Sequence, residues 1–112
     1  MSIDSYTLFL QARQEMKAAG AWHEAALSAQ RYIVELKEKR ENAYLKALQL
    51  GVPPVIAQAV ADNTWSEILN VREQGLQATQ MANYHRDCAE ALFVRRDKVL
   101  VREQRRFARG KS

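Results

Sequence analysis

The sequence predicts an all-α protein, arranged as an antiparallel helical hairpin or small helical bundle. Only four Gly and two Pro occur in 112 residues, so there are few positions at which a helix must stop. Apolar residues recur at steps of three and four along two long stretches, which is the spacing of one helix face. The hydrophobic fraction of 47 % is ordinary for a globular domain. Long, uninterrupted helices are therefore expected.

The first half of the chain is expected to form a short helix followed by a long one. Ser2, Asp4 and Ser5 offer side-chain oxygens that can cap the short helix, which we expect to end near Ala19, before Gly20. The long second helix is expected over residues 22–50, ahead of Gly51-Val52-Pro53-Pro54.

The second half is expected to form a short helix and then a long C-terminal one. The two prolines suit the first turn of a helix over residues 54–62, because a proline there needs no amide donor and already has a helical φ. A third long element is expected from Trp65 towards Phe107. Asn63-Thr64 can either cap its start or bend a helix that continues through them.

Two apolar seams with matching periods predict that the long helices pair antiparallel. In the register that we expect, paired residue numbers sum to 118, so that Ala43 lies near Gly75, and Leu36 near Ala82. Small residues recur on both seams, which would allow the two backbones to approach closely. The seams comprise Trp22, Ala26, Ala29, Ile33, Leu36, Arg40, Ala43, Ala47 and Leu50 on one side and Ile68, Val71, Gly75, Ala78, Ala82, His85, Ala89 and Leu92 on the other.

Apolar residues off these seams predict self-association. A helix pair with one short covering helix leaves several large side chains without an obvious partner, and a homo-oligomer that completes a four-helix arrangement would bury them. A first helix that folds back is the alternative. The residues concerned are Tyr32, Leu45, Leu48, Leu76, Met81, Tyr84 and Phe93.

Charge divides the chain into a helical body, residues 1–94, and a basic C-terminal arm, residues 95–112, within one expected domain. The body holds nine Lys and Arg against eleven Asp and Glu, whereas the arm holds eight basic residues against Asp97 and Glu103. The net charge of +4 is therefore a property of the arm.

The arm is the strongest functional candidate, because Arg suits phosphate and carboxylate oxygens and a helix would place several of its cations in one stripe. Such a stripe can follow a nucleic-acid backbone without reading sequence, or it can bind an acidic protein surface. If the arm is only a solvated helix end, it has no binding role. The candidate nucleic-acid-binding residues are Arg95, Arg96, Lys98, Arg102, Arg105, Arg106, Arg109 and Lys111.

No pattern in the sequence predicts an enzyme, a metal site or a cofactor. His85 and Cys88 lie one helical turn apart, but two ligands do not make a metal site, and we expect a packed histidine and an inert thiol. The carboxylates stand among Lys and Arg at helical spacing, as on a solvated face. A single cysteine, with no export signal or membrane-spanning run, favours a cytoplasmic setting.

Residues 43–63 have the spacing of a helix-turn-helix, with Gln58 as the one plausible reader of bases. No Lys or Arg occurs over residues 53–62, so a plain corner between helices is the simpler interpretation. The sequence thus favours a non-enzymatic, self-associating helical module with an arm that binds nucleic acid. The alternatives are a pure protein-protein adaptor, chaperone or structural subunit and, third, a helix-turn-helix regulator.

Overall fold

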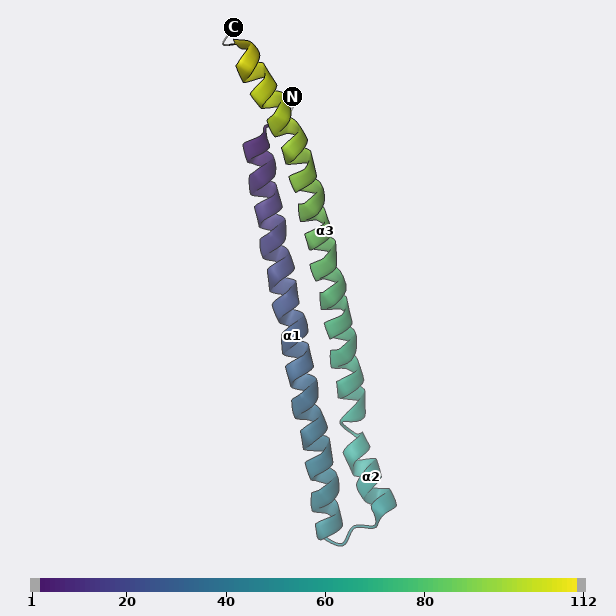
Figure 1. Cartoon of the computed structure of the whole chain (residues 1–112). Coiled ribbons are helices and arrows are strands. Elements are labelled where there is room, and N and C mark those ends of the chain that lie inside the picture. The colour runs from purple at the N-terminus through teal and green to yellow at the C-terminus, as the bar shows by residue number, and fades with distance from the viewer. Residues whose placement is uncertain (1–2, 111–112) are drawn as a thin grey trace. The chain divides into compact units, whose positions relative to one another are not determined.

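The computed structural model describes residues 3–110 and contains three α-helices (Figure 1). They are α1 (Ser5–Gln49), α2 (Pro54–Asp62) and α3 (Trp65–Gly110), with no strand among the described residues. The all-α prediction is confirmed, as are the short helix over residues 54–62 and the long helix that starts at Trp65. None of the three helices carries an apolar stretch long enough to cross a bilayer, over the residues described.

The predicted break at Gly20 is wrong, because α1 runs through that residue as one helix of 45 residues. Gly20 keeps a helical φ, and the positive φ of 83° found in the described chain belongs to Gly51. A lone glycine inside a helix costs only about 1 kcal/mol relative to alanine. Ala18, Ala19 and Ala21 beside it are strong helix formers, so the helix continues and the expected short N-terminal helix becomes its first four turns or so.

Capping contacts fix both ends of α1. Of the three proposed N-cap residues Asp4 performs the role, since its Oδ1 accepts a hydrogen bond from the Thr7 amide at 2.7 Å; Ser2 lies outside the described residues. At the other end, the Gly51 and Val52 amides donate to the carbonyls of Leu48 and Ala47. This is a Schellman cap, which requires the left-handed conformation of Gly51.

The turn at Asn63-Thr64 separates α2 from α3 rather than bending one continuous helix. The Asn63 and Thr64 amides donate to carbonyls in the last turn of α2, and the Thr64 hydroxyl donates to the Ala61 carbonyl at 2.9 Å. The Thr64 carbonyl accepts from the Ile68 amide and so opens α3. Thr64 therefore ends α2 through its amide and hydroxyl groups and begins α3 through its carbonyl group.

The described contacts divide into two compact units, which we treat separately. Unit 1 comprises Met1–Trp22 and Gln80–Ser112, and unit 2 comprises His23–Thr79. In unit 1 the start of α1 runs antiparallel to the end of α3: Ser5 contacts Glu103, Phe9 contacts Phe93, and Glu15 contacts His85.

Unit 2 is held by a small apolar core. Leu36, Ile68 and Val71 are buried together, with Ala29 and Ile33 packed against them. A Cβ on Gly75 would lie 3.2 Å from the Ala29 Cβ, so the two backbones approach closely there, as the small residues of the seams predict. Only glycine fits this contact without displacing its neighbour.

The predicted helix register is wrong. Gly75 meets Ala29 rather than Ala43, so the two residue numbers sum to 104 instead of 118. The difference of fourteen equals two heptads, which leaves the same seam faces in use. The reason is α2: its Asp62 pairs with Arg40, so α2 takes the positions beside the last turns of α1 that the prediction had given to α3.

Replacing Gly75 by leucine is expected to lower the free energy of unfolding by about 1–3 kcal/mol, because the larger side chain overpacks the contact with Ala29. Gly20→Ala is the matched helical control: nothing lies within 4 Å of a Cβ built there. It should raise the free energy of unfolding by about 0.5–1 kcal/mol. Urea unfolding followed by circular dichroism measures both. Equal effects would contradict the close approach of the helices.

Candidate functional site

The basic arm is helical as far as Gly110, which fixes where its cations point. At about 100° per residue, six of them fall within a single arc of about 100° on the surface of α3. Between residues 95 and 110 every position in that arc is Arg or Lys. We call this surface the basic arc; it comprises Arg95, Lys98, Arg102, Arg105, Arg106 and Arg109.

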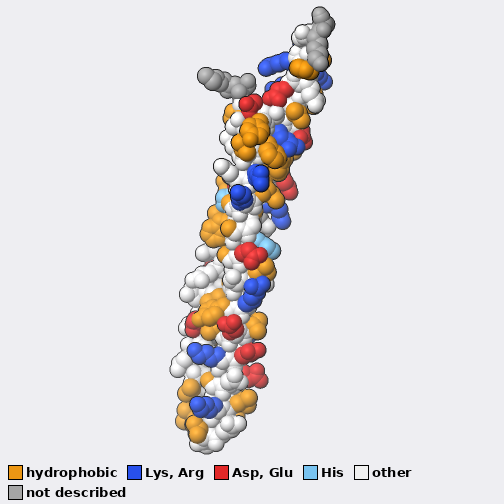
Figure 2. Space-filling view, turned by 90° about the vertical axis from the view of Figure 1, so that its left-hand side faces the viewer, with side chains coloured by type: hydrophobic (Ala, Val, Ile, Leu, Met, Phe, Trp, Pro, Cys, Tyr) orange, Lys and Arg blue, Asp and Glu red, His pale blue; other side chains and the backbone are white. Residues whose placement is uncertain are grey.

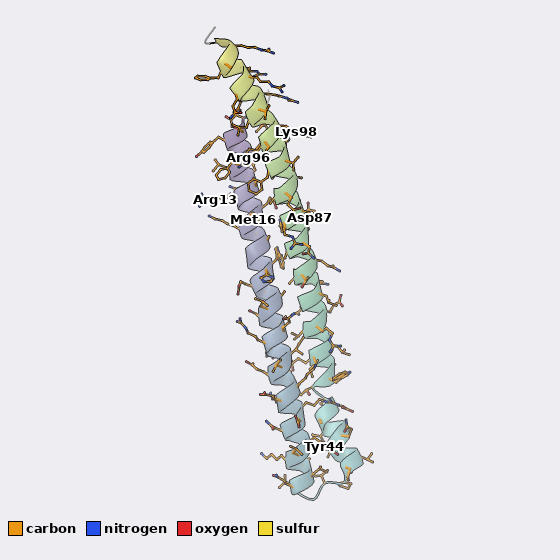
Figure 3. The ribbon with its side chains drawn as sticks, in the orientation of Figure 1. Arg13, Met16, Tyr44, Asp87, Arg96 and Lys98 are labelled. Carbon is orange, nitrogen blue, oxygen red and sulfur yellow. The ribbon has the colours of Figure 1, made fainter. Side chains whose placement is uncertain are left out.

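The basic arc faces away from α1. All six of its side chains are exposed, whereas the residues of α3 that contact α1, such as Phe93 and Glu103, lie on other faces of the helix. Figure 3 shows the same division for two neighbours, with Arg96 directed towards α1 and Lys98 away from it. The packing of α3 in unit 1 thus presents the basic arc to solvent.

Arg96 does not belong to this surface, although the sequence grouped it with the other arginines. Its guanidinium lies over the Phe9 and Phe93 rings, 5.7 and 5.2 Å from their centroids, and contacts the Asp97 carboxylate at 2.9 Å. Phe9 and Phe93 pack together with centroids 6.5 Å apart. Arg96 therefore joins the two helices of unit 1, a structural role that charge counting alone could not distinguish from binding.

Both acidic residues of the arm are occupied by contacts outside the basic arc. Asp97 pairs with Arg96, and Glu103 accepts hydrogen bonds from the Ser5 hydroxyl at 2.7 Å and the Ser5 amide at 3.0 Å. These two bonds, with a smaller contribution from the Arg106 charge, lower the pKa of Glu103. Glu103 stays ionised at neutral pH and caps the start of α1.

The charges of the basic arc are largely uncompensated. Within residues 3–110, Arg95, Lys98, Arg102 and Arg105 form no ion pair. Arg106 lies near enough to Glu103 to favour its ionised form, and Arg109 has an interaction of its own. Lys111, the last predicted binding residue, lies outside the described residues.

The His85 and Cys88 pair is placed within the packing of unit 1. His85 Nδ1 lies 2.5 Å from a Glu15 carboxylate oxygen, so this ring is held by a residue of α1. Cys88 is half-buried and is the main cause of the raised pKa of the exposed Tyr84 hydroxyl. No group of three or more His, Cys, Asp or Glu side chains able to hold a metal is found among the described residues.

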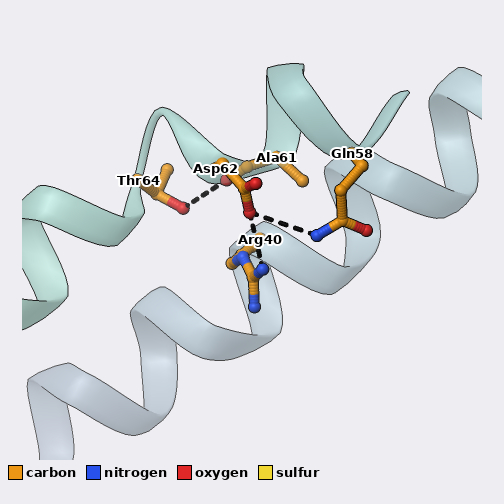
Figure 4. Close-up of polar contacts among 5 residues, drawn as sticks. All are labelled: Arg40, Gln58, Ala61, Asp62 and Thr64. Atoms are coloured by element: carbon orange, nitrogen blue, oxygen red, sulfur yellow. Dashed lines mark hydrogen bonds and ion pairs between the residues drawn. The ribbon is translucent and has the colours of Figure 1, made fainter. Parts of the chain in front are cut away.

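The corner between α1 and α2 contains a polar cluster around Asp62 (Figure 4). Asp62 accepts hydrogen bonds from Arg40 at 2.6 Å and from the Gln58 amide at 3.2 Å. The Arg40 hydrogen bond is the main reason that the pKa of Asp62 is lowered. Gln58, the proposed base reader, thus has its amide directed to its own helix. Base reading by Gln58 stays a prediction.

The sequence analysis placed Arg40 on the first seam, as its one charged member, and missed its part in this corner. Its guanidinium also lies 5.0 Å from the Trp65 ring centroid. A charged residue at a seam position, with Asp62 and Trp65 on the elements that follow, was the available indication. Around them lies an open groove of about 360 Å³ lined by Lys37, Arg40, Glu41, Tyr44, Gln58, Ala61 and Trp65.

Comparison with known proteins adds no further assignment. No protein-family model, no curated protein and no solved structure matches this chain. The candidate surface is therefore argued from its own geometry.

Arg96→Gln is expected to lower the free energy of unfolding by about 1 kcal/mol, because it removes the contacts of the guanidinium with Phe9 and Phe93. Arg102→Gln removes the same charge from the basic arc and should change the free energy of unfolding by less than about 0.5 kcal/mol. Urea unfolding of both variants tests whether Arg96 has a structural role that Arg102 lacks. If the two substitutions lower the free energy of unfolding equally, Arg96 contributes no more to stability than the exposed arginines do.

Glu103 is expected to make stability depend on acid pH. Because its folded pKa is below the ordinary value of 4.5, the stabilisation is complete above pH 4.5 and is lost as pH falls through the folded pKa. The urea midpoint of the native chain should exceed that of Glu103→Gln at pH 7, and the gap should close on acidification. If the difference in urea midpoint stays constant as the pH is lowered well below 4.5, the ionisation of Glu103 does not contribute to stability.

Proposed function

We propose that the chain is a non-enzymatic helical assembly module whose basic arc binds the phosphate backbone of nucleic acids without reading sequence. One observation carries the proposal: six exposed cations occupy every position of a single arc on α3. Five of the six are Arg, whose planar fork can donate two hydrogen bonds to one phosphate. A polymer with one negative charge at each step is the natural complement of such a row.

The electrostatics of the arm also favour a polyanion. Its acidic side chains make their hydrogen bonds with Arg96 and Ser5, on other faces of the helix, although Glu103 also lies near Arg106 of the basic arc. An anionic partner would therefore meet mainly positive charge along this face. Attachment of this kind requires no catalytic group, and the module would contribute position rather than chemistry.

Exposed apolar residues favour a second component of the proposal, which is association with protein. Only Leu8 and Ile68 are large side chains with almost no exposure, whereas twenty large hydrophobic residues of the described chain are exposed. On the face drawn in Figure 2, hydrophobic side chains stand among charged ones at the surface. Self-association that completes a helical bundle from antiparallel hairpins would cover such residues.

The same observation supports a pure adaptor or structural subunit as the second candidate function. There the basic arc would bind an acidic protein surface, and the apolar residues would supply most of the affinity. The two candidates differ in what competes for the basic arc and in how binding depends on salt.

Neutralising four cations of the basic arc is expected to abolish most nucleic-acid binding. With six phosphate contacts, the logarithm of the affinity of the native chain for duplex should fall with the logarithm of salt concentration with a slope of about −5. The variant Arg95→Gln, Lys98→Gln, Arg102→Gln, Arg105→Gln should give a slope of about −2. Fluorescence anisotropy of a mixed-sequence duplex over a salt series measures both.

The control carries the same change in charge at exposed positions elsewhere: Lys17→Gln, Arg31→Gln, Lys39→Gln and Lys46→Gln. It should keep the native slope, and circular dichroism should show all three proteins equally helical. Substitution is preferable to deleting the arm, because deletion would also remove the contacts of Arg96 and Glu103 with α1. No binding by the native chain at low salt, together with tight binding to polyglutamate, would replace this proposal by the adaptor.

A further inference from the structure

We infer that the ligand of the basic arc is double-stranded nucleic acid, bound through its phosphates, rather than single-stranded DNA or RNA. The inference rests on the proposed function and narrows it. Its basis is the juxtaposition of six cations, and of no other residue type, along one face of a helix whose opposite side is packed against α1.

Charge spacing is the first argument. Arg95 and Arg109 are fourteen residues apart, which is about 21 Å along a helix. Six cations over that length stand about 4.2 Å apart on average, and the two strands of a duplex together carry one phosphate per about 1.7 Å of the axis. A duplex therefore brings more phosphates within reach of this row of cations than a single strand does.

The absence of stacking side chains is the second argument. Proteins that hold single strands without sequence preference combine cations with aromatic rings on which the bases stack. No aromatic residue lies in the basic arc: Phe93 packs against Phe9, and Phe107 falls about 150° from the centre of the arc by helical geometry. The bases of a single strand would find no platform there, whereas the bases of a duplex need none.

Rigidity is the third argument. The segment with the basic arc is held to α1 as far as Glu103, by the Ser5–Glu103 hydrogen bonds and by Arg96 over Phe9 and Phe93. Arg105, Arg106 and Arg109 lie beyond these contacts on the same helix. The backbone that carries these cations is helical before binding, so only side-chain freedom is lost when they meet a stiff polymer. A flexible single strand would itself have to be straightened against this row.

The arc also contains no neutral hydrogen-bonding residue that could report base identity. Asn, Gln, Ser and Thr are absent from it, and Gln104 lies on another face of the helix by the same geometry. Contacts confined to phosphates position a protein but carry no sequence information. Duplexes of different sequence are therefore expected to bind alike.

The test compares full-length chain on four probes of equal phosphate number: two DNA duplexes of unrelated sequence, an RNA duplex and an unstructured oligothymidylate. Either or both kinds of duplex should bind at least about tenfold tighter than the single strand at equal salt. The two DNA duplexes should agree within about twofold. The variant with four cations of the arc neutralised should lose this preference, and the control variant should keep it. The two kinds of duplex also establish whether B-form or A-form geometry fits better.

Each result has a distinct meaning. Equal or tighter binding of oligothymidylate overturns the inference but leaves the proposed function intact. A strong preference between the two DNA duplexes would show that the contacts are not confined to phosphates. Binding to none of the four probes at low salt removes the proposed function as well.

Discussion

The close approach of the two helices in unit 2 is the constraint from which much of the remaining architecture follows. Gly75 faces Ala29 at a distance that admits no further carbon without a shift, and small buried residues continue on both helices. A seam of small side chains brings backbones together but encloses little apolar volume. Twenty large hydrophobic side chains of the described residues are exposed.

In unit 1 the helices are joined by polar and aromatic contacts, and these set the rotation of α3 about its axis. Phe93 and Arg96 meet Phe9, and Glu103 meets Ser5, so the face that carries these three residues must turn towards α1. Helical geometry then places the basic arc on the outward side. The exposure of the basic arc is therefore a consequence of packing contacts that other residues make.

The helices could be predicted largely from their punctuation, because the Pro53-Pro54 pair and Gly51 dictate local geometry. Gly20 misled the prediction, since one glycine among alanines does not end a helix. The register could not be obtained from period alone: sequences with a seven-residue repeat fit equally well after a shift of two heptads, and α2 decides between them by pairing with Arg40. The basic arc followed from charge and period. The different role of Arg96 required knowledge of which face meets Phe9.

The hydrogen bonds between Ser5 and Glu103 join residues 98 positions apart in the chain, and this separation has a consequence for synthesis. As the ribosome extends the chain, unit 2 has all of its partners once Thr79 has emerged. The first five turns of α1 must wait until the residues that pack against them, 80–103, have also been made. Throughout that interval Phe9 and its neighbours are uncovered, so this part of α1 is made before unit 2 but is protected from aggregation after it.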